Sequence, residues 1–169
     1  QEPSDYIQSQ IDQCIELFKN DQFRETVALG ESLAVQFPNS PILYEILGAA
    51  NLNLGNIEET IKNYRKLLHH NPKHTDAYNN LGIAFYNQGN FLKAVKNYQK
   101  AIEIEPNFSD AHYNLGNAMK KMGDLRKAIE SYEASLKINP EDTEVLISYG
   151  NALKNDGSFK QAIDCFTNL

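Results

Sequence analysis

Apolar residues recur at intervals of three and four along most of the chain, which is the spacing of one face of an α-helix. Within residues 75–87 this face is made by Ala77, Tyr78, Leu81 and Phe85. A second stripe follows within residues 91–104: Phe91, Val95, Tyr98, Ala101 and Ile102. The pattern therefore predicts two short amphipathic helices joined by a tight turn.

The residues between the two stripes are typical of a helix end followed by a helix start. Gly89 fits the left-handed position after a helix, and Asn90 fits the N-cap of the next one. The second helix is expected to end before Pro106, because proline disfavours helix at the residue that precedes it. In the preceding hairpin, the three-residue spacing of Asn56 and Glu59 predicts a capping box.

This hairpin recurs with a fixed period. Four prolines lie 34 residues apart: Pro38, Pro72, Pro106 and Pro140. A fixed period in this range is typical of stacked helical repeats, and it divides the chain into residues 1–40, 41–74, 75–108, 109–142 and 143–169. The last three units open on residues that are expected to cap their first helices: Thr75, Ser109 and Thr143.

Each unit from residue 41 onward also has a glycine at its eighth position, in the middle of the first helix. Glycine there costs about 1 kcal/mol relative to alanine. Gly82 and its equivalents are therefore expected where two helices approach too closely for a side chain. Ala94 and Ala128 are the predicted small partners across this contact.

The first and last units depart from the period. Residues 1–40 have Gln13 and Cys14 where later units have a large apolar residue and glycine, and their stripe fits better with a turn one residue shorter. We interpret them as a divergent capping repeat. Residues 143–169 end inside a second helix, which predicts either a longer parent chain or an apolar end that stacks on another molecule.

Composition excludes several classes of function. The chain has 169 residues, 41% of them hydrophobic, and no apolar window approaches the length of a membrane span. The formal net charge is −6 and no basic run exceeds two residues, which argues against a nucleic-acid surface. The two cysteines, near opposite ends of the chain, favour a reducing compartment over a disulfide, so the expected location is the cytoplasm.

No residue pattern predicts catalysis, a cofactor or a metal site. His69, His70 and His74 flank a proline turn, but no fourth ligand is evident, so solvated loop histidines are expected. Cys14 and Cys165 have no histidine or aspartate at a spacing that would suggest a nucleophile. The repeat pattern and these residues together favour a binding protein over an enzyme.

The units resemble the tetratricopeptide repeat over residues 41–169. The matching residues, in the order of the family pattern, are Tyr78, Leu81, Gly82, Phe85, Ala94, Tyr98, Ala101 and Pro106. The resemblance implies an all-α fold of tandem helix-turn-helix repeats that form a right-handed superhelical α-solenoid. Asn51, His112 and Leu146 replace aromatic residues of the pattern, and His112 is expected to be a packing residue.

In this family the first helices line a concave groove, and the resemblance assigns a set of groove positions to this chain. They are Asp76, Asn79, Asn80, Ile83, Tyr86, Asn87, Asp110, Tyr113, Asn114, Asn117, Lys120, Lys121, Ser148, Asn151, Lys154 and Asn155. Asparagine side chains both donate and accept hydrogen bonds, so a row of them can hold the backbone of an extended peptide. The row is similar to the asparagine ladder in the repeat domains of O-linked N-acetylglucosamine transferases.

Three functions follow from these observations. The leading hypothesis is a non-catalytic scaffold that binds an extended peptide or partner segment in the groove. A second is the N-terminal substrate-docking module of a larger bacterial glycosyltransferase or sulfotransferase. A third is a structural oligomer that self-associates through the uncapped C-terminal end.

Overall fold

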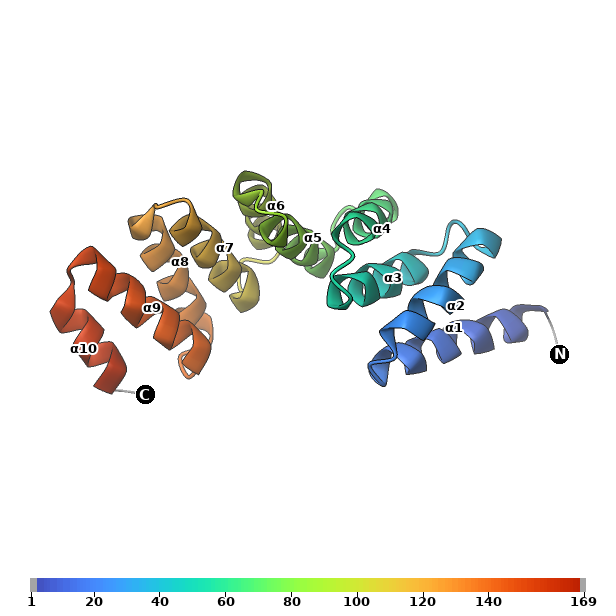
Figure 1. The fold of residues 1–169 in the computed structure, drawn as a ribbon, viewed down its shortest axis with the longest axis horizontal. Helices are drawn as coiled ribbons and strands as arrows, with labels where there is room; N and C mark the ends of the chain where they lie inside the picture. Colours follow the sequence, from blue (N-terminus) through green and yellow to red (C-terminus); the bar gives the residue numbers. More distant parts are fainter. Residues whose placement is uncertain (1–2, 168–169) are drawn as a thin grey trace. The chain divides into compact units, whose positions relative to one another are not determined.

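The computed structural model describes residues 3–167, with side chains from Tyr6 onward. The ends of the first and last predicted units, residues 1–2 and 168–169, lie outside the described residues. All regular structure within 3–167 is helical (Figure 1), and the helices are α1 Pro3–Lys19, α2 Phe23–Gln36, α3 Pro41–Asn53, α4 Ile57–His70, α5 Thr75–Asn87, α6 Phe91–Ile104, α7 Ser109–Lys121, α8 Leu125–Ile138, α9 Thr143–Asp156 and α10 Phe159–Thr167.

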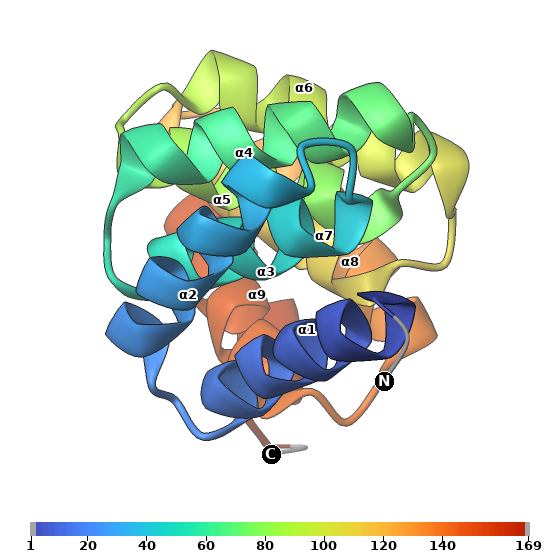
Figure 2. The same ribbon diagram turned by 90° about the vertical axis from the view of Figure 1, so that its right-hand side faces the viewer.

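The chain forms two compact units, Gln1–Ala84 and Phe85–Leu169. In the first unit α2 packs against α1 and α3, and α3 packs against α4; Figure 2 shows the α1–α2 hairpin from its outer side. In the second unit α7 packs against α6 and α8, and α9 packs against α8 and α10. Each of these helices packs on its neighbours in sequence, as in stacked helical hairpins, so the predicted all-α repeat fold is confirmed.

A residue with positive φ makes the turn inside each hairpin that the period defines. Gly55, Gly89, Gly123 and Gly157 have φ between 75° and 87°. The same place in the first hairpin is taken by Asp21, at φ 56°. Asp21 precedes Gly55 by one full period, so the first turn has the regular length and the predicted shorter turn is wrong.

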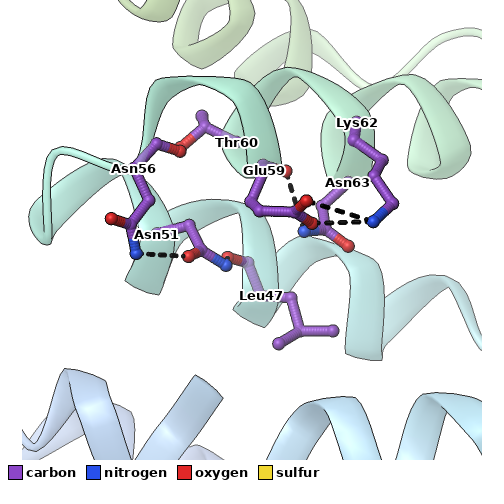
Figure 3. A network of polar contacts seen from close by, with 7 residues as sticks. All are labelled: Leu47, Asn51, Asn56, Glu59, Thr60, Lys62 and Asn63. Atoms are coloured by element: carbon purple, nitrogen blue, oxygen red, sulfur yellow. Dashed lines mark hydrogen bonds and ion pairs between the residues drawn. The ribbon is translucent and has the colours of Figure 1, made fainter. Parts of the chain in front are cut away.

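The starts of the second helices show that nearby contacts determine whether a residue's side chain caps the helix. Asn90 accepts a hydrogen bond from the Lys93 amide at 3.2 Å, which confirms it as an N-cap. Asn56 makes no such bond, so its predicted capping box is wrong. Its Nδ2 instead donates to Oδ1 of the buried Asn51 on α3, at 3.0 Å (Figure 3). A polar partner on the neighbouring helix has replaced the cap.

The N-caps of the first helices lie one residue before the predicted ones. The Ala77 amide donates to Nδ1 of His74 at 3.3 Å. Before α9, Oδ1 of Asp142 accepts hydrogen bonds from two backbone amides. Thr75 and Thr143 are thus the first residues of their helices rather than the caps.

The mid-helix glycines make room for an aromatic ring of the second helix. A Cβ added at Gly116 would lie 2.6 Å from the ring of Tyr132, closer than real Cβ contacts. The same holds for Gly48 beneath Tyr64, at 2.9 Å. The prediction of a close helix contact is confirmed here, but the group above Gly116 is the tyrosine ring and not Ala128.

A recurring hydrogen bond joins the first helix of a repeat to the period proline that precedes it. The Tyr44 hydroxyl donates to the Pro38 carbonyl at 2.6 Å, and Tyr78 makes the equivalent bond. In the next 34-residue repeat, Nε2 of His112 lies 2.9 Å from the carbonyl oxygen of Pro106. His112 therefore keeps this contact in place of tyrosine and does more than pack.

The core of the first compact unit accommodates a residue that departs from the repeat pattern. Cys14 occupies the place of the helix glycine and is fully buried, in a cluster with Ile11, Leu33 and Leu43. Burial raises the pKa of the Cys14 thiol, which keeps it protonated. Among the described residues, every buried side-chain nitrogen or oxygen has a hydrogen-bond partner.

Candidate functional site

The predicted groove residues of the first unit lie on α5, and they differ in exposure. Asp76 is exposed and Ile83 is half-buried. Asn79 is only 6% exposed, which leaves little of its side chain for a ligand. Nδ2 of Asn80 donates to the hydroxyl of the buried Tyr64 at 2.9 Å. This bond uses one of the two N–H groups of the Asn80 amide, and its carbonyl oxygen and other N–H take no part in it.

In the second compact unit a tyrosine joins α7 and α9, which are the first helices of two successive repeats. The Tyr113 hydroxyl on α7 donates to Oε1 of Glu144 on α9, at 2.8 Å. It also lies 3.4 Å from Oγ of Ser148, one turn further along α9. These contacts hold Tyr113, Glu144 and Ser148 together and leave Tyr113 half-buried.

Asn117 also bonds to a core tyrosine, but here the asparagine accepts the hydrogen bond, whereas Asn80 donates it. The hydroxyl of the fully buried Tyr132 donates to Oδ1 of Asn117 at 2.7 Å. This bond leaves Nδ2 of Asn117 as a hydrogen-bond donor for a ligand. Two asparagines of the predicted row are therefore oriented by core tyrosines, with different atoms left over.

The other predicted groove residues of the second unit lie at or near its surface. Tyr86 is half-buried and packs edge-to-face on Phe91, with ring centroids 5.3 Å apart. Burial, and to a smaller extent the nearby Tyr113, raises the pKa of Tyr86. Asn114 and Lys120 are half-buried, and the exposed members are Asn87, Asp110, Lys121, Asn151, Lys154 and Asn155.

Charge on α7 and α9 is divided between their two ends. Asp110 and Glu144 lie in the first turns, and Lys120, Lys121 and Lys154 lie in the last turns. At 1.5 Å per residue the two ends of α7 that carry these charges are about 15 Å apart. A bound segment would therefore meet acidic groups at one edge and basic groups at the other.

Family models match these helical units. A model described as a TPR repeat matches residues 48–89 and 84–123, and one described as the tetratricopeptide repeat matches residues 109–142. Together the matches run from residue 48 to residue 142, more than half of the chain. The chain is a tetratricopeptide-repeat protein.

Solved structures agree with this assignment. The repeat protein is similar to MamA, with a TM-score of 0.86 at 24% identity over 95% of this chain and 88% of that one. It is also similar to PilF of Pseudomonas aeruginosa, with a TM-score of 0.83 at 18% identity over 99% of this chain and 78% of PilF. A third match is YrrB, described as a TPR protein with an unusual peptide-binding site, with a TM-score of 0.76 at 16% identity over 92% and 80% of the two chains. At these identities the likeness shows the fold alone. Comparison with curated proteins finds no match.

The histidines of this tetratricopeptide-repeat protein have local roles. The His70 ring stacks on Tyr44, with centroids 6.1 Å apart. His74 caps α5, and its Nε2 lies 3.5 Å from a carboxylate oxygen of Glu45. Within residues 3–167 no three histidine, cysteine, aspartate or glutamate side chains gather as a metal ion would require. Nor does the same part of the chain contain a helix that is both long and apolar enough to cross a bilayer.

Two surface features stand out in the folded chain. One is a shallow hollow at the hairpin turns of the second unit, beside Phe91, Leu92 and Met122. The other is an exposed apolar face on α10, which includes Phe159 and Ile163. The sequence reasoning missed the hollow, because the repeat pattern gives its residues no special mark. An apolar C-terminal end was among its expectations.

Proposed function

We propose that this repeat protein is a scaffold that binds an extended peptide or partner segment on the face formed by α7 and α9. The observation that supports this most directly is the orientation of Asn117, whose amide is held by a core tyrosine so that one donor points away from the bond. A preoriented amide loses less conformational freedom when it binds than a freely rotating one. The exposed Asn151 lies on the next first helix and continues the row.

An extended segment suits the chemistry of this face. Its backbone offers alternating N–H and C=O groups, which asparagine amides can pair with regardless of sequence. Tyr86 and Tyr113 supply aromatic surface for its side chains. The lysines at the ends of α7 and α9 favour acidic residues at one end of the segment.

The test uses peptides selected by the protein from a random display library. The double variant Asn114→Ala/Asn151→Ala should bind the selected peptides at least tenfold more weakly in a fluorescence-polarisation titration, because backbone hydrogen bonds are lost. Gln99→Ala, at an exposed position of α6, is the matched control and should bind as the parent does. Far-UV circular dichroism should be the same for all three proteins. Equal affinity of the double variant and the control would refute the proposal.

A second candidate function, self-association, is favoured by the exposed apolar face of α10 and is developed below. The docking-module hypothesis stays a prediction. Its test is the full reading frame, because a transferase domain encoded beside these repeats is what it requires.

A further inference from the structure

Three apolar side chains of α10 form a stripe that the described residues leave exposed in part, although the ring of Phe166 also packs over Gly150 of α9. Phe159 is 64% exposed, Ile163 is 63% exposed and Phe166 is 39% exposed. Their spacing of four and three residues places them along one side of the helix. Such a stripe on a short amphipathic helix is typical of a surface that packs on another helix.

The equivalent positions of earlier hairpins are half-buried or buried. One period before Phe166 is Tyr132, which is fully buried, and one period before that is Tyr98, 1% exposed. Two periods before Ile163 is Val95, 8% exposed. In the second unit α8, which carries Tyr132, packs against the first helix of the next hairpin, α9. The stripe on α10 is therefore a helix-packing surface without a covering helix among the described residues.

The charged residues beside this stripe, Lys160 and Asp164, can pair with their counterparts on a second copy of α10. Lys160 and Asp164 are both exposed and lie on the same flank of α10, four residues and about 6 Å apart. Neither forms an ion pair with any other described residue. If a second α10 is laid antiparallel across a twofold axis near Ala162, each Lys160 faces the Asp164 of the other copy. The two reciprocal ion pairs then lie along one side of the contact between the apolar stripes.

The part of α1 whose side chains the structure describes, residues 6–19, does not offer a matching surface. The exposed side chains of α1 are mostly polar or charged, among them Gln8, Asp12, Glu16 and Lys19. Several are already paired, as Lys19 is with Glu16 at 2.8 Å. A head-to-tail contact would bury polar groups of α1 against the stripe, which is unfavourable. Pairing of like ends has no such cost.

We propose that α10 is an isologous interface: two copies of this chain associate through antiparallel α10 helices, with Phe159, Ile163 and Phe166 in contact and Lys160 paired with Asp164 across the twofold axis. The proposal deepens the self-association candidate and is independent of peptide binding on α7 and α9. The interface is small, so the dimer is weak and forms as concentration rises. Dimerisation would present two binding faces per assembly and raise avidity for a repetitive partner.

The test measures the mass of the 169-residue chain by sedimentation equilibrium, from about 1 μM to about 1 mM, the range in which weak complexes form. The mass should rise with concentration from 19.1 kDa toward twice that value. Lys160→Asp and Asp164→Lys should each raise the dissociation constant at least tenfold, because each places like charges opposite one another twice. Ile163→Asp should do the same by removing apolar contact.

An equimolar mixture of Lys160→Asp and Asp164→Lys is the decisive sample. In a mixed antiparallel pair both ion pairs form, one as in the parent and one with its charges exchanged, so the mixture should associate as well as the parent. Arg126→Asp, at the exposed position one period before Lys160, changes the net charge equally and should leave the dissociation constant unchanged. A parent chain that stays monomeric throughout, or a mixture that associates no better than either variant alone, overturns the proposal.

Discussion

Replacing Gly116 by alanine would set two opposing effects against each other. In the interior of a helix alanine is favoured over glycine by about 1 kcal/mol. The new methyl group would lie 2.6 Å from the ring of Tyr132, which is fully buried and cannot swing into solvent. Overpacking of this kind costs about 1–3 kcal/mol. Moving the ring would also strain the 2.7 Å bond between its hydroxyl and Asn117, which is worth about 1 kcal/mol. We expect a net loss of about 1–3 kcal/mol.

The assay is urea unfolding followed by far-UV circular dichroism. Gly116→Ala should lower the midpoint with the slope unchanged, since a changed slope would mean that a different transition is being compared. The same substitution is then made in a Tyr132→Leu background, where no ring lies over the glycine. There the propensity term should dominate, so alanine should be neutral or stabilising by about 1 kcal/mol.

The two backgrounds together separate ring contact from helix propensity. A large coupling between the substitutions is expected, because they touch the same space. If Gly116→Ala stabilises the parent protein, or destabilises both backgrounds equally, then the ring is not what requires glycine and the reasoning is refuted.

Three further outcomes are expected. Asp142→Ala removes the side-chain cap of α9 and should cost about 1 kcal/mol in the same urea assay; an unchanged midpoint would contradict this. The Lys127 side chain, together with its backbone amide, lowers the pKa of Asp124, so this carboxylate stabilises the folded state above its ordinary pKa and the contribution is lost as pH falls through the lowered value. Asp124→Asn should therefore reduce the difference in urea midpoint between neutral and acid pH, and an equal difference in both proteins would contradict that assignment. Cys165, partly exposed, should react with Ellman's reagent in the native protein while the fully buried Cys14 reacts only on unfolding, so equal rates would show that Cys14 is accessible.

The repeat architecture could be predicted from sequence because single residues determine its boundaries. A turn that needs positive φ selects glycine, and a helix that must end selects proline after it. The turn glycine marks the period in the last four units and the proline marks it in the first four. Asp21 takes the turn position in the first hairpin, and aspartate does not indicate a positive φ as glycine does. For this reason the predicted turn was one residue too short.

Contacts between helices were harder to predict. Asn56 is a good N-cap by residue type, but Asn51 on the facing helix binds its amide instead. His74 and Thr75 are adjacent and both could cap α5, so sequence alone does not decide between them. The bonds between asparagines of the predicted groove and core tyrosines join residues 15 or 16 positions apart, on different helices. No local pattern encodes which atom of an amide such a bond leaves exposed.

The hydroxyl of Tyr132 links the proposed recognition face to the core, so a change in one constrains the other. A change to phenylalanine would preserve packing over Gly116 and free the Asn117 amide to turn either way. The last hairpin already has this combination, with Phe166 over Gly150 and an exposed Asn151 on the same helix as that glycine. If this face binds a partner as proposed, tyrosine or phenylalanine at this core position should covary among homologues with the groups that the neighbouring asparagine binds.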